Sequence, residues 1–277
     1  MNHAFPRTLA LGALAALIIT TPATLRGQVV INEILYHAPE DLEDLQFVEL
    51  HNAGDDPVDL SGWSFTHGIQ FRFPPGSRLE PRGFLVLCRD QALHEKFFHS
   101  PAAGTFQSRL SRKGERLELA DAAGRVADSV HYDDQPPWPT GADGHSGSLE
   151  RISPRAPSND PANWTSSPLS ENRETPTGTP GQPNAALSAE LPPVLTSVTF
   201  SPELPAPGEP IRVESTLRPS PGAVSVNLRF RLAGPGTESP ETTIPMAPSA
   251  AGRYVATIPG QAAGQLIRFR VEAVGDN

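Results

Sequence analysis

The chain has 277 residues, of which 22 are basic and 31 acidic, and its formal net charge is −9. Nucleic-acid affinity rests largely on Lys and Arg neutralising phosphates, so this balance argues against binding to nucleic acids or to anionic membranes. The single cysteine, Cys88, excludes an intramolecular disulfide, so the stability of the fold has to come from packing.

The N-terminus has the three parts of a secretory signal peptide. Arg7 supplies a positive charge, an apolar run extends from Leu9 to Ile19, and small residues offer cleavage after Ala23 or Gly27. A membrane-spanning helix needs about 20 apolar residues, so this run is too short for a permanent anchor. We therefore expect residues 1–27 to be removed. The mature protein would then be secreted or held at the cell surface without membrane insertion, with 20 basic residues against 31 acidic ones and a charge of −11.

Short alternating apolar segments, separated by turn residues, predict an all-β fold. Gly and Pro together make up 54 of the 277 residues, about 19 per cent, which is typical of a loop-rich chain. Disordered low-complexity chains have a higher Gly and Pro content, of ~25–30 per cent. Strands are expected over 29–36 and 47–52, and a further strand should place Ile69, Phe71 and Phe73 on one face with Gln70 and Arg72 in water. A short helix is expected within 90–98, and a hairpin around the turn 121–124.

Six short motifs occur in one particular order between Val29 and Asn184. They are Ile31–Ile34 (INEI), Phe47–Asn52 (FVELHN), Asp59–Trp63 (DLSGW), Phe71–Gly76 (FRFPPG), Gly114–Leu119 (GERLEL) and Gly178–Gly181 (GTPG). In this order they resemble the lamin tail domain, an immunoglobulin-like β-sandwich that many secreted bacterial proteins carry. The most specific part is the fourth motif, which is followed by Leu79 and the apolar run 84–87.

The resemblance implies a lamin tail domain over residues 28–184. It also implies that a Ser-Leu-Glu-Arg segment at 148–151, the pair Asn163-Trp164 and the turn 179–181 close the domain, with Trp138 and Trp164 packed on the sandwich. The true linker would then be short, about residues 185–192.

Residues 193–277 show a second set of period-two apolar segments, typical of an immunoglobulin or fibronectin-III sandwich. Six strands are expected where seven make such a domain, which predicts that the domain is truncated before its last strand and that the chain is a fragment. The arrangement, with motifs at 208–210 (GEP) and 258–261 (IPGQ), also resembles exported bacterial proteins that continue into a CotH-type kinase domain. None of that domain's sequence is present, so this resemblance implies a context and not an activity.

Several residues that carry chemistry elsewhere have simpler interpretations here. Residues 144–148 begin like a hydrolase nucleophile elbow, but the fifth position is Ser148 and no helix is expected after it, so a turn is favoured. The eight histidines include no pair at the i, i+4 spacing of zinc enzymes, and His131 near Asp133 and Asp134 is typical of a solvated loop. Cys88 ends an apolar run, which favours a buried hydrophobe over a catalytic thiol.

Acidic residues raise two further possibilities. Exported sandwiches often bind Ca²⁺ through loop carboxylates, but solubility explains the acidic loops equally well and neither has EF-hand spacing. These loops contain Glu40, Asp41, Glu43 and Asp44, and Asp133, Asp134 and Asp143. Glu33 and Glu49 lie within expected strands, where paired carboxylates would suit acid–base catalysis. The favoured interpretation is that they face outward or toward a backbone donor.

The sequence therefore predicts a non-catalytic exported protein that serves as a structural, adhesion or docking module, with no catalytic residue, cofactor or metal ligand. Its expected partner is a protein or a cell-surface polymer, bound through loops or exposed strand edges. The alternative is that the chain is the N-terminal accessory region of a larger secreted enzyme, a CotH-type kinase or a hydrolase, whose catalytic domain lies beyond Asn277.

Overall fold

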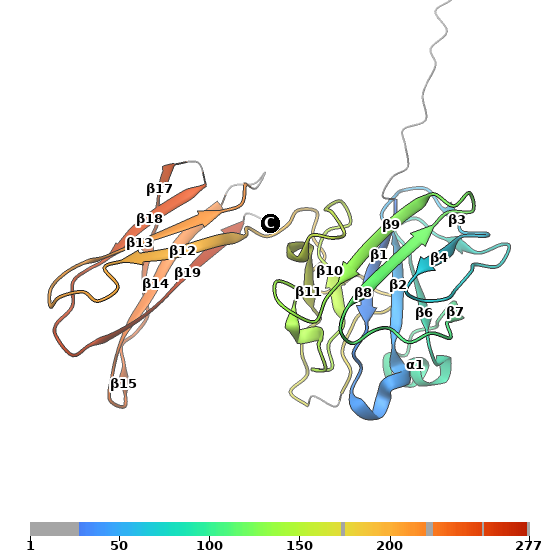
Figure 1. Cartoon of the computed structure of the whole chain (residues 1–277), viewed down its shortest axis with the longest axis horizontal. Helices are drawn as coiled ribbons and strands as arrows, with labels where there is room; N and C mark the ends of the chain where they lie inside the picture. The colour runs from blue at the N-terminus through green and yellow to red at the C-terminus, as the bar shows by residue number, and fades with distance from the viewer. Residues whose placement is uncertain (1–27, 173–174, 220–223, 251, 276–277) are drawn as a thin grey trace, which may run out of the picture.

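The chain folds into two β-sandwiches joined end to end (Figure 1). The computed structural model describes residues 28–172, 175–219, 224–250 and 252–275, so the predicted signal peptide lies outside the described residues. Within those ranges the structure is nearly all β, which confirms the predicted fold class. No helix in the described part is both long and apolar enough to cross a membrane.

The first sandwich is built on a six-stranded sheet in the order β11-β10-β1-β2-β6-β7. Its strands are β1 (Val29–Leu35), β2 (Phe47–Asn52), β6 (Phe84–Cys88), β7 (Gly104–Thr105), β10 (Leu149–Arg151) and β11 (Trp164–Ser166). The opposing layer contains a three-stranded sheet, β4-β8-β9, and a short pair, β3 with β5. These strands are β3 (Val58–Asp59), β4 (Ser64–His67), β5 (Arg78–Leu79), β8 (Glu115–Ala120) and β9 (Val126–Tyr132).

One hydrophobic core fills the space between these layers, and Trp138 and Trp164 both belong to it. The predicted hairpin is present, since β8 and β9 pair antiparallel across the turn at 121–124. The expected strand around residues 69–73 is wrong in one respect. Ile69 and Phe73 are buried and the residues between them alternate as predicted, but the segment forms an isolated bridge and irregular turns in place of a regular strand.

The other face of the six-stranded sheet is also covered. A 3-10 helix, η1 (Glu40–Leu45), and the helix α1 (Gln91–Phe98) pack over a second apolar cluster that includes Phe47 and Cys88. The Asp90 side chain accepts a hydrogen bond from the Leu93 N–H (2.8 Å) and so caps the first turn of α1. The predicted short helix is confirmed, and the sheet is buried on both faces.

The second sandwich pairs two further sheets, β12-β13-β18-β17 and β15-β14-β16, with β19 hydrogen-bonded to the free side of β14. The strands are β12 (Leu195–Ser201), β13 (Ile211–Leu217), β14 (Val224–Gly234), β15 (Thr237–Glu238), β16 (Thr242–Pro245), β17 (Ala247–Ala250), β18 (Arg253–Ile258) and β19 (Leu266–Gly275). The described residues of this second sandwich thus contain eight strands where six were expected. The two missed strands, β15 and β17, are short, exposed and without apolar alternation.

The segment that joins the sandwiches is hydrogen-bonded to the first of them. The Ser188 N–H donates to the Ile152 carbonyl (2.8 Å), and the Ser153 hydroxyl donates to the Ala189 carbonyl (2.9 Å). An ion pair of 2.5 Å between Arg218 and Asp160 links the two sandwiches directly. The domain limits at 184 and 193, and the assignment of 185–192 as a linker, stay predictions.

Candidate functional site

Three glutamates from neighbouring strands meet on one face of the six-stranded sheet. Glu33 of β1 is opposite Glu150 of β10 on one side and Glu49 of β2 on the other. Directly opposite residues on adjacent strands point to the same face, so the three side chains form a row. All three residues are 0% exposed. A row of buried acids is strongly destabilising unless the carboxyl groups are hydrogen-bonded or protonated.

A single stretch of chain supplies a backbone donor to each of these acids. We call residues 177–185 the closing segment. The Thr179 N–H donates to Glu33 Oε1 (2.9 Å), the Gly181 N–H donates to Glu49 Oε2 (2.5 Å), and the Ala185 N–H donates to Glu150 Oε2 (3.1 Å). The row of carboxyl groups therefore holds the closing segment against the sheet, more than 130 residues along the chain from β1 and β2.

Side chains complete the coordination of the acids. The Ser148 hydroxyl donates to Glu33 Oε1 (2.6 Å), and the Asn32 amide donates to Glu49 Oε1 (2.8 Å) and to Asn184 Oδ1 (2.8 Å). The Asn184 amide donates in turn to the Asn32 carbonyl (3.1 Å), which fixes the end of the closing segment on β1. Both asparagines are buried.

Gly178 is required where the closing segment passes closest to the acids. A Cβ atom at this position would lie 2.6 Å from Glu33 Oε1 and 3.1 Å from the Ser148 hydroxyl oxygen, and the residue has φ +152°. Only glycine combines that close approach with that backbone conformation at low cost. The Gly-Thr-Pro-Gly motif therefore has a direct physical role in seating the segment on the carboxyl row.

The Thr179 hydroxyl bridges two carboxyl groups of the cluster. Thr179 Oγ1 lies 3.1 Å from Glu33 Oε2 and 3.3 Å from Glu150 Oε1. A hydroxyl has one hydrogen, so it donates to one of these oxygens, and the other contact becomes a hydrogen bond when that carboxyl is protonated and donates to the hydroxyl.

The pKa values agree in direction with a retained proton. Burial raises the pKa of Glu33 to about 7, with a smaller increase from the nearby charge of Glu150 and opposing effects of the bonds from Ser148 and Thr179. Burial, followed by the charge of Glu33, raises the pKa of Glu49 well above its usual value. Burial likewise raises the pKa of Glu150. The raised pKa values of all three acids favour a protonated carboxyl group within the cluster.

This arrangement fastens the chain and does not present a reactive group. The prediction that Glu33 and Glu49 face outward is wrong, whereas the alternative, that they face a backbone donor, is confirmed. Glu150 was missed as a member of the site. The sequence feature that could have placed Glu150 in the site is its position between Leu149 and Arg151 in the Ser-Leu-Glu-Arg segment. In a strand, these two neighbours point to one face of the sheet and Glu150 points to the other.

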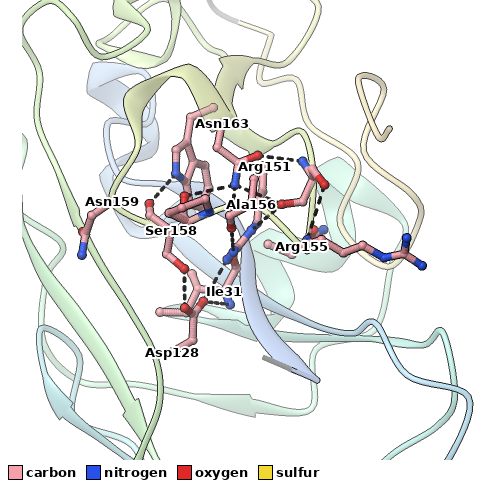
Figure 2. Close-up of polar contacts among 12 residues, drawn as sticks. Ile31, Asp128, Arg151, Arg155, Ala156, Ser158, Asn159 and Asn163 are labelled. Carbon is pink, nitrogen blue, oxygen red and sulfur yellow. Dashed lines mark hydrogen bonds and ion pairs between the residues drawn. The ribbon is translucent and has the colours of Figure 1, made fainter. Parts of the chain in front are cut away.

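Arg151 makes the corresponding connection on the other face of the sheet (Figure 2). The residue is 2% exposed, and its Nη1 donates to Asp128 Oδ2 (2.9 Å) and to the Ile31 carbonyl (3.2 Å). Asp128 belongs to β9, and its Oδ2 also accepts the Ile31 N–H (2.8 Å). This buried ion pair therefore links β1 and β10 of one sheet to β9 of the other.

The same network shapes the loop between β10 and β11 (Figure 2). Asn163 Oδ1 accepts the Ser153 N–H (2.8 Å), while its amide nitrogen donates to the Ser153 carbonyl (3.0 Å). Trp164 Nε1 donates to the Ser158 carbonyl (2.8 Å), and the Arg151 guanidinium lies over the Trp164 ring, with its Cζ atom 6.0 Å from the ring centroid. The Ser-Leu-Glu-Arg and Asn-Trp motifs thus act together to close the first sandwich.

The acidic loops form ion pairs. Glu43 pairs with Arg109 and with Arg112 (2.8 Å), and Asp44 pairs with Arg89 (2.9 Å). In the second loop, Lys113 pairs with Asp134 at 2.6 Å, and Asp143 Oδ1 is hydrogen-bonded to His37 Nδ1 at 2.6 Å. The described residues, which exclude the side chain of Glu40, contain no group of three or more His, Cys, Asp or Glu side chains placed to hold a metal ion.

The remaining candidate residues have structural surroundings. Ser146 has φ +69° in a turn that leads into β10 and not into a helix, as predicted. Cys88 is 0% exposed and burial raises the pKa of its thiol to about 11, which confirms the prediction of a buried hydrophobe.

His94 was not singled out from the sequence, but it is 0% exposed between Phe47 and Phe98. Neither of its ring nitrogens has a hydrogen-bond partner in the described structure, and burial lowers its pKa to about 4. The i, i+4 spacing of His94 and Phe98 on α1 was the signal that the histidine faces the sheet.

Comparison with known proteins agrees with this architecture. Residues 22–134 match the family model of the Lamin Tail Domain. The matched region includes Glu33 and Glu49, whereas Glu150, Arg151 and the closing segment follow it. A search of curated proteins finds no match to the chain. Over residues 22–134 the chain is therefore similar to the lamin tail domain family, whose immunoglobulin-like sandwich is a structural or binding module.

Proposed function

We propose that the chain is a non-catalytic exported protein whose β-sandwiches serve as structural, adhesion or docking modules. The observation that carries this proposal is the use made of the buried carboxyl row. Glu33, Glu49 and Glu150 are fully covered, and each accepts a backbone N–H from the closing segment. Groups that a hydrolase would expose to substrate are here committed to holding the sandwich together. The similarity to the lamin tail domain supports a structural or binding module.

The partner we propose is a protein or a cell-surface polymer. The proposed mature charge of −11 disfavours nucleic acids and anionic lipid surfaces, because both would repel the chain. Rigid sandwiches bind through loops and strand edges, which carry exposed backbone groups. Nothing among the described residues favours the alternative of an enzyme accessory region, which stays a prediction.

Export is tested by fusing residues 1–27 to a reporter enzyme that is active only outside the cytoplasm. We expect reporter activity from this fusion and none from a matched fusion carrying Leu17→Arg, because a charge in the apolar run blocks membrane targeting. Equal activity from the two fusions, or inactivity of both with full-length fusion protein present in the cytoplasm, would contradict export.

Docking is tested with the purified, fluorescently labelled chain and intact cells of the organism that encodes it. We expect saturable binding that an excess of unlabelled chain displaces. Protease treatment of the cells abolishes binding if the partner is a protein, and polysaccharide digestion abolishes it if the partner is a polymer. Non-saturable adsorption, or no binding, would contradict an adhesion or docking role.

A further inference from the structure

His94 is a fully buried histidine whose ring lies among apolar groups. Its ring contacts Phe47 of β2 and Phe98 of α1, with centroids 5.4 Å and 5.1 Å away, and neither ring nitrogen has a hydrogen-bond partner among the described residues. A buried polar group without a partner costs stability, and a buried charge without a partner costs far more. The site therefore accepts the neutral imidazole and disfavours the imidazolium.

The titratable groups around the ring do not offer the imidazolium a partner. On the sheet face beneath it these groups are Glu33, Glu49, His51 and Cys88. The described charged or titratable side chains of η1, and of α1 with its two caps, are Asp41, Glu43, Asp44, Asp90, Glu95, Lys96 and His99. None of these groups is hydrogen-bonded to the His94 ring, and burial alone lowers the pKa of His94 to about 4.

The cover that buries His94 is separate from the main core. The apolar cluster under α1 and η1 shares no residue with the core between the two layers, and α1 lies at one end of the first sandwich (Figure 1). A helix of eight residues is marginal in water by itself, so α1 depends on this packing. Beneath it, β2 and β6 are held together by their own strand pairing. The helix can therefore lift while the sheet and the main core stay intact.

We propose that protonation of His94 releases α1 from the sheet, so that acid uncovers the apolar face formed by Phe47, Val86 and Cys88. The imidazolium gains hydration only when α1 lifts, because the closed state provides it with no hydrogen-bond acceptor. An uncovered ring has the usual pKa of 6.5, against about 4 when α1 is closed. The ratio of open to closed molecules is therefore expected to rise about 70-fold between pH 7.5 and pH 4.5.

Cys88 provides a direct readout of this opening. It is the single cysteine of the chain, and it is buried in the apolar cluster under α1. The probe is 4,4′-dithiodipyridine, a disulfide that reacts with thiols at acid and at neutral pH, and its rate of reaction with Cys88 is measured in the purified chain. The natural protein is compared with His94→Leu at each pH, because the ratio of the two rates cancels the pH dependence of the thiol reaction itself. This ratio is expected to rise about 70-fold from pH 7.5 to pH 4.5.

Two further variants and a urea series separate the release of α1 from other effects of acid. His94→Gln keeps a polar side chain that does not titrate, so it should lack the acid response, as His94→Leu does. The matched control His131→Leu removes an exposed imidazole from β9 and should respond to acid as the natural protein does. Release of α1 exposes little surface, so the labelling rate should depend weakly on urea, whereas labelling through global unfolding would rise steeply with urea.

A rate ratio that stays constant between pH 7.5 and pH 4.5 would overturn the proposal. So would a Cys88 thiol that stays unreactive throughout this range, a steep dependence of the labelling rate on urea at pH 4.5, or an acid response that persists in His94→Gln. The proposal goes beyond the proposed function and does not depend on export, on the carboxyl row or on the second sandwich.

Discussion

Replacing Glu33 by Gln is the most direct test of the carboxyl row. The amide oxygen of Gln can accept the same hydrogen bonds from the Ser148 hydroxyl and the Thr179 N–H, so the closing segment stays in place. What the substitution removes is the titrating proton. The variant should therefore differ from the natural protein in the pH dependence of its stability and not in its fold.

The sign and size of this effect follow from the pKa of Glu33. Its usual value is 4.5, and burial raises it to about 7 in the folded chain. Between these values the folded state binds more protons than the unfolded state, so the stabilising contribution is present below pH 4.5 and is lost as the pH rises through 7. A shift of this size corresponds to at most about 3 kcal/mol, at about 1.4 kcal/mol per pH unit. Between pH 5 and pH 8 the Gln variant should gain up to that amount relative to the natural protein.

The free energy of unfolding can be measured by urea titration at half-unit pH steps, followed by the fluorescence of the core residues Trp138 and Trp164. The quantity to compare is the difference between variant and natural protein, because Glu49, Glu150 and His94 contribute to both curves. The exposed Glu203→Gln controls for the loss of one negative charge.

Parallel pH profiles for the natural protein and Glu33→Gln would refute the reasoning. They would mean that Glu33 holds no proton that folding retains. A variant destabilised equally at every pH would point instead to a loss of hydrogen-bond geometry. Amide hydrogen exchange at Thr179 and Gly181 would then show whether the closing segment had detached.

Three further predictions concern the packing of the first sandwich. Relative to the natural protein, His94→Leu should become more stabilising as the pH falls from 6.5 to 4, by up to about 3 kcal/mol in urea titrations. The reason is that the folded state resists protonation of this buried ring. A stability difference that does not change with pH would contradict this prediction. Arg151→Met should destabilise the fold by roughly 3–5 kcal/mol, because it leaves the buried acid Asp128 without its ion-pair partner. The control Arg155→Met, on the exposed loop, should be near neutral. Similar shifts in melting temperature for the two variants would refute the role of the Arg151 network. A chain ending at Gln135 should be several kcal/mol less stable than one ending at Asn184, because it lacks the core residues Trp138 and Trp164. Equal melting temperatures of the two chains would indicate that residues 136–184 are a linker.

The strands could be predicted because their apolar residues alternate with the period of a pleated sheet. Val48 and Leu50 alternate in β2 and face the main core, and the hairpin of β8 and β9 follows from alternation on either side of a glycine turn. The motif at 69–73 was overinterpreted, because alternation fixes which side chains face the core and does not fix whether the backbone forms a ladder. β15 and β17 were missed because they are held by neighbours and have no apolar pattern of their own.

The candidate site was predictable only in part. Glu33 and Glu49 could be placed on strands, but their burial depends on residues 177–185, which read as a polar, Pro- and Gly-rich loop. A single sequence shows the period of a strand and does not show which distant segment covers its second face. The donors come from backbone N–H groups, which every residue except proline carries, so no side-chain pattern marks them.

The carboxyl row explains why the first sandwich extends past the part that is similar to the lamin tail domain. Without the closing segment, Glu33 and Glu49 would lose a backbone donor each, and the sheet face that carries them would be open to water. Exposed, the two acids would ionise freely and repel each other across adjacent strands. Once covered, the same pair holds a distant segment of chain and retains a proton. Acids that a catalytic interpretation would assign to proton transfer therefore act here as a fastening that depends on burial.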